Sequence, residues 1–150
     1  MSTVSELLAA RVLAHVLHHG QTDKAGRPIV EHVERVTAAV PLNAAPAACL
    51  HDLVEDGHVT LAALAAGGFC AATLAAVDAL TRRANEPYRD YIDRLAPNAV
   101  ARVVKLADLR DNLDPRRLDA ARAAGHDTTA LEQRYNDAVL RLLGRGERAA

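Results

Sequence analysis

The chain has 150 residues, 50% of them hydrophobic and 25% charged, which is enough to bury one core and predicts a single domain over residues 1–150. A net charge of −1 and an aromatic content of 3% exclude the basic surface and the stacking platforms that nucleic-acid-binding proteins use. The sequence shows neither an apolar run of about 18 residues nor a signal-peptide pattern, so we expect a cytoplasmic protein with no membrane partner.

Helical patterns cover most of the chain. Ala and Leu, which favour helices, supply much of the apolar content, and β-branched residues do not alternate, so we predict an all-α fold, a compact helical bundle. The expected helices span about residues 3–19, 28–40, 45–56, 61–66, 71–82, 88–95, 98–113, 115–124 and 129–144, with residues 145–150 frayed. Cys49 and Cys70 are too few for a disulfide framework and are expected to be buried, reduced thiols.

The first expected helix carries apolar residues at helical spacing, which is typical of an amphipathic helix with one side on the core. These residues are Val4, Leu7, Leu8, Val12, Val16 and Leu17. His15 and His19 lie four residues apart on the same helix and could bind a metal ion together. We favour surface or capping roles for them, because no acidic residue lies near them in the sequence.

The third expected helix contains a histidine and three carboxylates within six residues, His51-Asp52-Leu53-Val54-Glu55-Asp56. Residues four apart share a face of a helix, so His51 lies above Glu55 and Asp52 above Asp56 in one polar arc. Taken alone, this arc is either the solvated face of an ordinary amphipathic helix or part of a metal site.

Two other helices bear on that choice. His32 lies on an otherwise apolar helix, where a lone histidine is either a satisfied core residue or a ligand. In the helix over residues 98–113, apolar side chains surround a narrow stripe formed by Lys105, Asp108 and Asn112. A buried polar stripe costs free energy unless its groups are paired or bind something, so we favour a site over a simple Lys105–Asp108 ion pair.

Together these segments supply a complete set of metal ligands. The ligand-type side chains are His32, His51, Asp52 and Asp108. Two imidazoles and two carboxylates suit a borderline divalent ion such as Mn²⁺, Fe²⁺ or Zn²⁺. Such an ion would activate a water molecule and polarise a phosphoryl oxygen, and Glu55 and Asp56, one turn further on, are placed to orient or deprotonate that water.

The same segments resemble the HD family of metal-dependent phosphohydrolases, and in particular the (p)ppGpp hydrolase domain of RelA/SpoT proteins and the small alarmone hydrolases. The matching residues are His18-His19-Gly20-Gln21 with Lys24 and Gly26, Pro28 with His32, residues 51–56, Leu80-Thr81, and Lys105-Leu106-Ala107-Asp108 with Asn112. The resemblance therefore covers most of the chain, and it implies an HD-domain helical bundle.

The resemblance also implies a reaction and a set of roles. The family removes the 3′-pyrophosphate of guanosine tetraphosphate or pentaphosphate. By resemblance, His32, His51, Asp52 and Asp108 bind Mn²⁺, with Fe²⁺, Zn²⁺ and Mg²⁺ left open; Glu55 and Asp56 activate water; and Lys24, Lys105 and Asn112 contact the nucleotide.

The chain departs from the family at Asp23, where the alarmone hydrolases carry an arginine that lies against the base. An aspartate offers no cation–π contact, so we expect Asp23→Arg to lower KM for a guanosine alarmone. Two alternatives stay open. One is a hydrolase of another nucleotide or phosphate ester, and the other is a non-catalytic HD module that binds a nucleotide or a partner.

Overall fold

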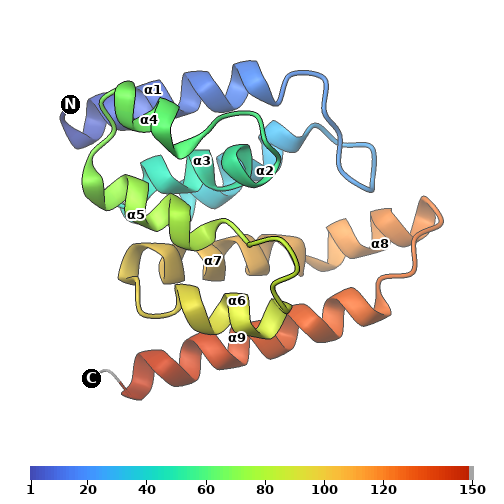
Figure 1. Ribbon diagram of the computed structural model, residues 1–150. Coiled ribbons are helices and arrows are strands. Elements are labelled where there is room, and N and C mark those ends of the chain that lie inside the picture. The colour runs from blue at the N-terminus through green and yellow to red at the C-terminus, as the bar shows by residue number, and fades with distance from the viewer. Residues whose placement is uncertain (149–150) are drawn as a thin grey trace.

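The computed structural model describes residues 1–148 and shows an all-α protein, as predicted. Within these residues the helices are α1 (Thr3–Leu17), α2 (Ile29–Ala38), α3 (Ala45–Glu55), α4 (Leu61–Ala66), α5 (Ala71–Leu80), α6 (Tyr88–Leu95), α7 (Ala99–Asn112), α8 (Pro115–Ala123) and α9 (Thr129–Arg148). They pack into a compact bundle (Figure 1).

Local capping signals determine several helix boundaries. α4 and α6 span the residues expected from the sequence. The hydroxyl of Thr60 accepts a hydrogen bond from the Ala63 amide at 3.1 Å, and the side-chain oxygen of Asn98 accepts one from the Ala101 amide at 2.9 Å. Such caps satisfy amides that have no partner inside the helix, which explains why α4 and α7 begin where they do.

α1, α2 and α5 end about two residues before the expected positions, and α9 ends about four residues after its expected end. α1 ends at Leu17 rather than near His19, because the chain turns at His18 and Gly20 adopts a φ of +76°. α9 continues to Arg148, although the helix was expected to end near Gly144 and residues 145–150 to fray. A glycine inside a helix costs only about 1 kcal/mol, so α9 passes through Gly144 without ending. Residues 149 and 150 lie outside the described part of the chain.

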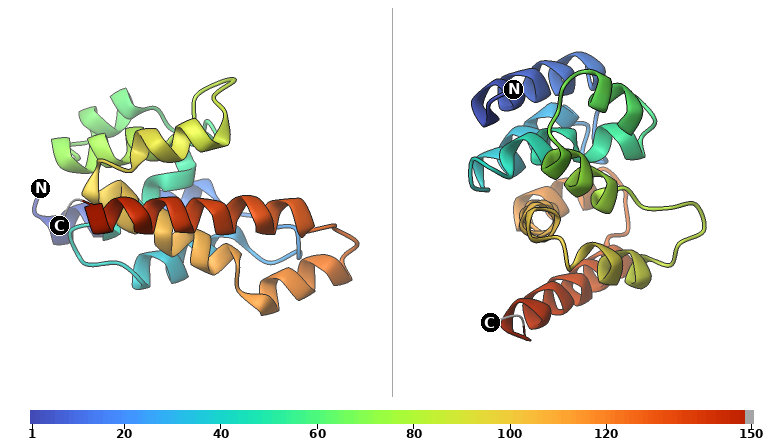
Figure 2. Two further views of the ribbon diagram at one scale, coloured as in Figure 1. Left: turned by 90° about the horizontal axis from the view of Figure 1, so that it is seen from below. Right: turned by 60° about the vertical axis from the view of Figure 1, so that its left-hand side comes forward.

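α3, which carries His51, and α7, which carries Asp108, lie side by side at the centre of the bundle. α3 also packs against α1, α2 and α5, and α7 also packs against α2, α5 and α9. The right-hand view of Figure 2 shows α7 nearly end-on, with α2, α3 and α5 on one side of it and α6 and α9 on the other. The apolar residues next to the polar groups of these helices are fully buried, namely Leu50, Leu53, Val104 and Leu109. The polar groups of both helices are therefore supported by close-packed apolar side chains.

The most buried apolar residues of α1 are alanines, and only part of the expected Val and Leu stripe packs against the core. Ala10 and Ala14 are buried, as are Ala47 and Ala48 of α3, on which α1 packs. Small side chains on both helices let their backbones approach closely. Four larger apolar residues of α1 are exposed instead, namely Val4, Leu8, Val12 and Val16. The prediction that the whole stripe faces the core is therefore wrong for these four residues, whereas Leu7 and Leu17 pack against the core as expected.

The start of α5 shows a second departure. Cys49 is buried, as expected, but Cys70 is exposed. Beside it, the buried carboxylate of Glu6 accepts hydrogen bonds from the Cys70 amide and from the Thr73 hydroxyl, the latter at 3.1 Å, so α1 provides the cap for α5. Across residues 1–148, no helix has the length and apolar character needed to cross a membrane.

Candidate functional site

His51 is held rigidly within α3. Its Nδ1 lies 2.6 Å from the carbonyl oxygen of Ala48, to which it donates, so Nε2 points away from the helix backbone. Oδ1 of Asp52 lies 3.2 Å from this Nε2, and Oδ1 of Asp108 lies 3.7 Å from it. Although His51 is buried, its Nε2 has no aligned hydrogen-bond partner among residues 1–148. A buried ring nitrogen faced by two carboxylates without a hydrogen bond is arranged as a ligand would be.

His32 reaches the same point from α2. Its Nε2 lies 3.1 Å from Oδ1 of Asp108, while its Nδ1 lies 2.6 Å from Oδ2 of Asp111. Ligand atoms of His32, His51 and Asp108 all lie within 4.8 Å of one another, and all three residues are buried. The structure therefore brings together side chains from α2, α3 and α7 that could hold a metal ion. Asp52 lies beside this group and is partly exposed.

The polar stripe of α7 contains the Lys105–Asp108 ion pair, and its Asp108 also faces His32 and His51. Oδ2 of Asp108 accepts from Lys105 Nζ at 2.7 Å, and Oδ1 accepts from the amide of Asn112 at 2.8 Å. Lys105 also lies 5.4 Å from the ring centre of Tyr91. These contacts orient the Asp108 carboxylate toward the two histidines. They also engage Lys105 and Asn112, which we had expected to contact the nucleotide.

The electrostatics of the group favour a cation. Burial alone would lower the pKa of His51, but Asp52 and Asp108 outweigh it and raise the pKa to about 9. The pKa of His32 is raised in the same way, against burial, by Asp108 and Asp111. Although burial opposes the charged form of Asp108, Lys105 and the two imidazoles hold its pKa well below the usual range. The cluster thus retains positive charge around its carboxylates, a role that a divalent ion would take over.

A cleft of about 580 Å³ opens beside this group. All residues expected in the site except His51 line this cleft, namely Lys24, His32, Asp52, Glu55, Asp56, Lys105, Asp108 and Asn112. His51 is buried behind the wall of the cleft. Partial burial raises the pKa of Glu55, although the positive charge of Lys105 opposes the shift. Partial burial and the negative charge of Asp52 both raise the pKa of Asp56. Arg82, Arg117 and Arg134 add positive charge to the rim of the cleft.

Two residues of the site were missed in the sequence. Asp111 contacts His32 and also accepts from Arg35 Nε at 2.7 Å, and Arg117 donates to Asp111 at 2.6 Å. Asp111 lies three residues after Asp108, so the helical spacing that singled out Lys105 and Asp108 could have included it. Arg117 lies on α8, and no pattern in the sequence connects it with α2.

The Asp23 side chain stabilises the loop between α1 and α2. Its Oδ1 accepts from the amides of Ala25 and Arg27, both at 2.9 Å, and its Oδ2 accepts from Arg117 at 3.1 Å. These bonds keep the carboxylate ionised, since they hold its pKa below the usual value against the effect of burial. Asp23 therefore positions Arg117 rather than standing free beside a ligand.

The pair His15 and His19 does not form a site among the described residues. His15 Nε2 lies 2.9 Å from Oε1 of Glu34, and His19 is exposed beyond the end of α1. Neither a protein-family model nor a curated protein matches this chain.

Proposed function

We propose that this protein is a metal-dependent phosphohydrolase that acts on a phosphorylated nucleotide. The observation that carries the proposal is the meeting of His32, His51 and Asp108, from three helices, around the buried Nε2 of His51, which faces two carboxylates without an aligned hydrogen bond. Burial of such a polar group costs free energy, and a bound ion would offset that cost. A cytoplasmic location and an HD-type bundle belong to the same proposal.

The donor set fits a divalent cation, and we propose Mn²⁺. His32, His51, Asp52 and Asp108 would hold it, and the contact of His32 with Asp111 and that of His51 with Ala48 would orient both rings. When bound, such an ion acts as a Lewis acid toward a phosphoryl oxygen and makes water a better nucleophile. Fe²⁺ and Zn²⁺ are the alternatives that the same donors suit, and Mg²⁺, which prefers oxygen ligands, is the least favoured of the ions considered.

Glu55 and Asp56 supply the proton chemistry in this proposal. Both line the cleft one turn beyond Asp52 on the same helix. The raised pKa of Glu55 brings its carboxylate closer to the operating pH, which makes it a better general base. We assign Glu55 to accept the proton of the attacking water, and Asp56 to orient that water.

The walls of the cleft suit a substrate with several phosphates. Lys24, Arg82, Arg117 and Arg134 line it together with Lys105, so the cations lie on more than one side. The hydroxyl of Tyr88 is buried at the cleft and has no hydrogen-bond partner within residues 1–148, so it is free to contact a bound ligand. A guanosine tetraphosphate or pentaphosphate, cleaved at its 3′-pyrophosphate, is the lead candidate.

The second candidate is another nucleotide or phosphate ester. It is favoured by one observation, namely that Asp23 is engaged with Arg117 and with the loop backbone. The chain consequently offers no cation at that position to stack on a guanine base.

A substrate panel tests the proposal. Purified protein with Mn²⁺ is incubated with guanosine tetraphosphate, guanosine pentaphosphate, other nucleotides and simple phosphate esters, and the released pyrophosphate and phosphate are measured. Release of pyrophosphate from the alarmones, abolished by chelator and by Asp52→Ala, supports the lead candidate. Activity on other nucleotides alone selects the second candidate. A protein that binds nucleotide but is inactive with every metal is a non-catalytic module.

A further inference from the structure

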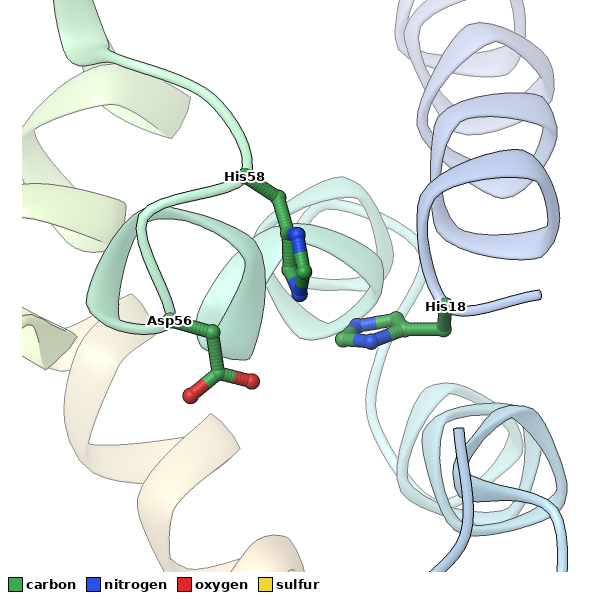
Figure 3. Close-up of side chains that lie close together, drawn as sticks. All are labelled: His18, Asp56 and His58. Atoms are coloured by element: carbon green, nitrogen blue, oxygen red, sulfur yellow. The ribbon is translucent and has the colours of Figure 1, made fainter. Parts of the chain in front are cut away.

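A second group of potential ligands lies at the junction of α1 and α3. It consists of His18, Asp56 and His58, and one ligand atom from each lies within 4.8 Å of the other two. Figure 3 shows the three side chains pointing toward one another, His18 from the end of α1, Asp56 from the end of α3 and His58 from the loop that follows. The group is separate from His32 and His51, although Asp56 also lines the cleft.

The orientation of the His18 ring suits a metal ligand. It is 1% exposed, and its Nδ1 lies 2.8 Å from Oε1 of Gln21, to which it donates. That contact leaves the lone pair on Nε2, which is buried and without a partner in the described structure. Metal-binding histidines characteristically donate their second ring nitrogen to such an oxygen, which fixes the tautomer and the ring orientation.

The backbone after α3 fixes the position of His58. The His58 amide donates to the carbonyl of Leu53 at 2.9 Å, and the Gly57 amide donates to that of Val54 at 3.1 Å. This is the Schellman arrangement, and it requires the φ of +77° that Gly57 adopts. The turn brings the His58 ring to a centroid distance of 5.6 Å from the His18 ring. Nε2 of the same Gln21 donates to Nε2 of His58 at 2.7 Å, so one amide orients both imidazoles, and an ion bound by His58 replaces this hydrogen bond.

The Asp56 carboxylate completes the group. It makes no hydrogen bond or ion pair with the residues that the structure describes, so both of its oxygens can bind an ion. Two imidazoles and one carboxylate form the set of three protein ligands that leaves a fourth position for water on Zn²⁺. The nitrogen donors disfavour Ca²⁺ and Mg²⁺, which prefer oxygen.

We propose that His18, Asp56 and His58 form a second divalent-metal site that binds Zn²⁺. The site does not depend on the proposed hydrolase activity, because it is defined by its own ligands. It would hold the Asp56 carboxylate at the mouth of the cleft whichever substrate the protein accepts.

Zinc binding to matched variants tests the proposal without an activity assay. Chelator-treated wild type, His58→Ala, His19→Ala and His32→Ala are titrated with Zn²⁺ by calorimetry, and the bound zinc is counted after dialysis. His58 is exposed, so His58→Ala should stay folded, which circular dichroism checks. His19 is an exposed histidine next to His18 and serves as the matched control.

We expect about two zinc ions per chain for wild type and His19→Ala, and about one for His58→Ala and for His32→Ala, because each of these variants removes a ligand from a different site. Replacement of zinc by Co²⁺ gives a second readout, because a tetrahedral absorption band that His58→Ala removes assigns His58 as a ligand. Zinc binding to His58→Ala at the wild-type level, or an equal loss in His19→Ala, would overturn the proposal.

Discussion

The carboxylate of Asp111 lies 2.6 Å from Nδ1 of His32, on the opposite edge of the ring from the nitrogen that faces Asp108. This contact orients His32 and makes its Nε2 a stronger electron-pair donor toward a metal ion. We expect Asp111→Asn to weaken Mn²⁺ binding by about 10–100-fold while His32 itself stays in place. Metal titration by calorimetry measures the effect. Asp114→Asn is the matched control, because Asp114 contacts Arg116 and not His32, and an equal loss there would refute the role of Asp111.

Mn²⁺ should stabilise the wild type against heat, because it binds the folded chain and not the unfolded one. At a concentration 100 times the Kd the gain is about 2.7 kcal/mol. Asp52→Ala should abolish this gain and should also lower stability in chelator, since Asp52 lies 3.2 Å from Nε2 of His51 and stabilises its charged form. Thermal melts with Mn²⁺ and with chelator provide the comparison. Identical melting temperatures for the wild type in the two conditions would exclude the ion.

Glu55→Gln should separate chemistry from metal binding. The amide keeps the shape of the side chain but cannot accept the proton of the attacking water, so turnover should fall by about 10²-fold or more. Metal content, measured by elemental analysis, should stay at the wild-type level. A variant that loses its metal would instead identify Glu55 as a ligand.

The metal-free protein should lose stability as the pH rises from about 6.5 to about 9. The folded pKa of His51 is about 9, above the ordinary value of 6.5, so the folded chain binds more protons than the unfolded chain in this window. The stabilisation is complete below pH 6.5 and is lost as the pH passes the folded value. Urea unfolding in chelator at several pH values measures the slope, and His51→Gln should reduce it. Excess Mn²⁺ should reverse the trend, because the ion competes with the proton.

Asp23→Arg should raise KM for a guanosine alarmone, which reverses the expectation from the sequence. The substitution removes the acceptor of two loop amides and places a second cation against Arg117. Asp23→Asn keeps an oxygen for the loop amides, so its KM should change less. Steady-state kinetics on both variants decide the point. A lower KM for Asp23→Arg would show that stacking on the base outweighs the loss of the loop bonds.

Local signals in the sequence predicted the helices well, because caps such as Thr60 and Asn98 act within one turn. The grouping of His32 with His51 and Asp108 came from the family resemblance together with the buried stripe of α7. Arg117 and the pair His18 and His58 were not found, since their contacts depend on how distant helices pack. The exposure of Val4, Leu8, Val12 and Val16 on α1 was not predicted for the same reason, since it depends on the packing of the α1 alanines against α3.

The ligands of the central group are spread widely along the chain, from His32 on α2 to Asp108 on α7. During synthesis the first two helices of the site leave the ribosome well before α7 exists. A nascent chain therefore holds two imidazoles and the Asp52 carboxylate without the fourth donor. An ion bound by this group would therefore find its full set of ligands only after α7 has docked against α2 and α3, and it would stabilise the chain only from that point on.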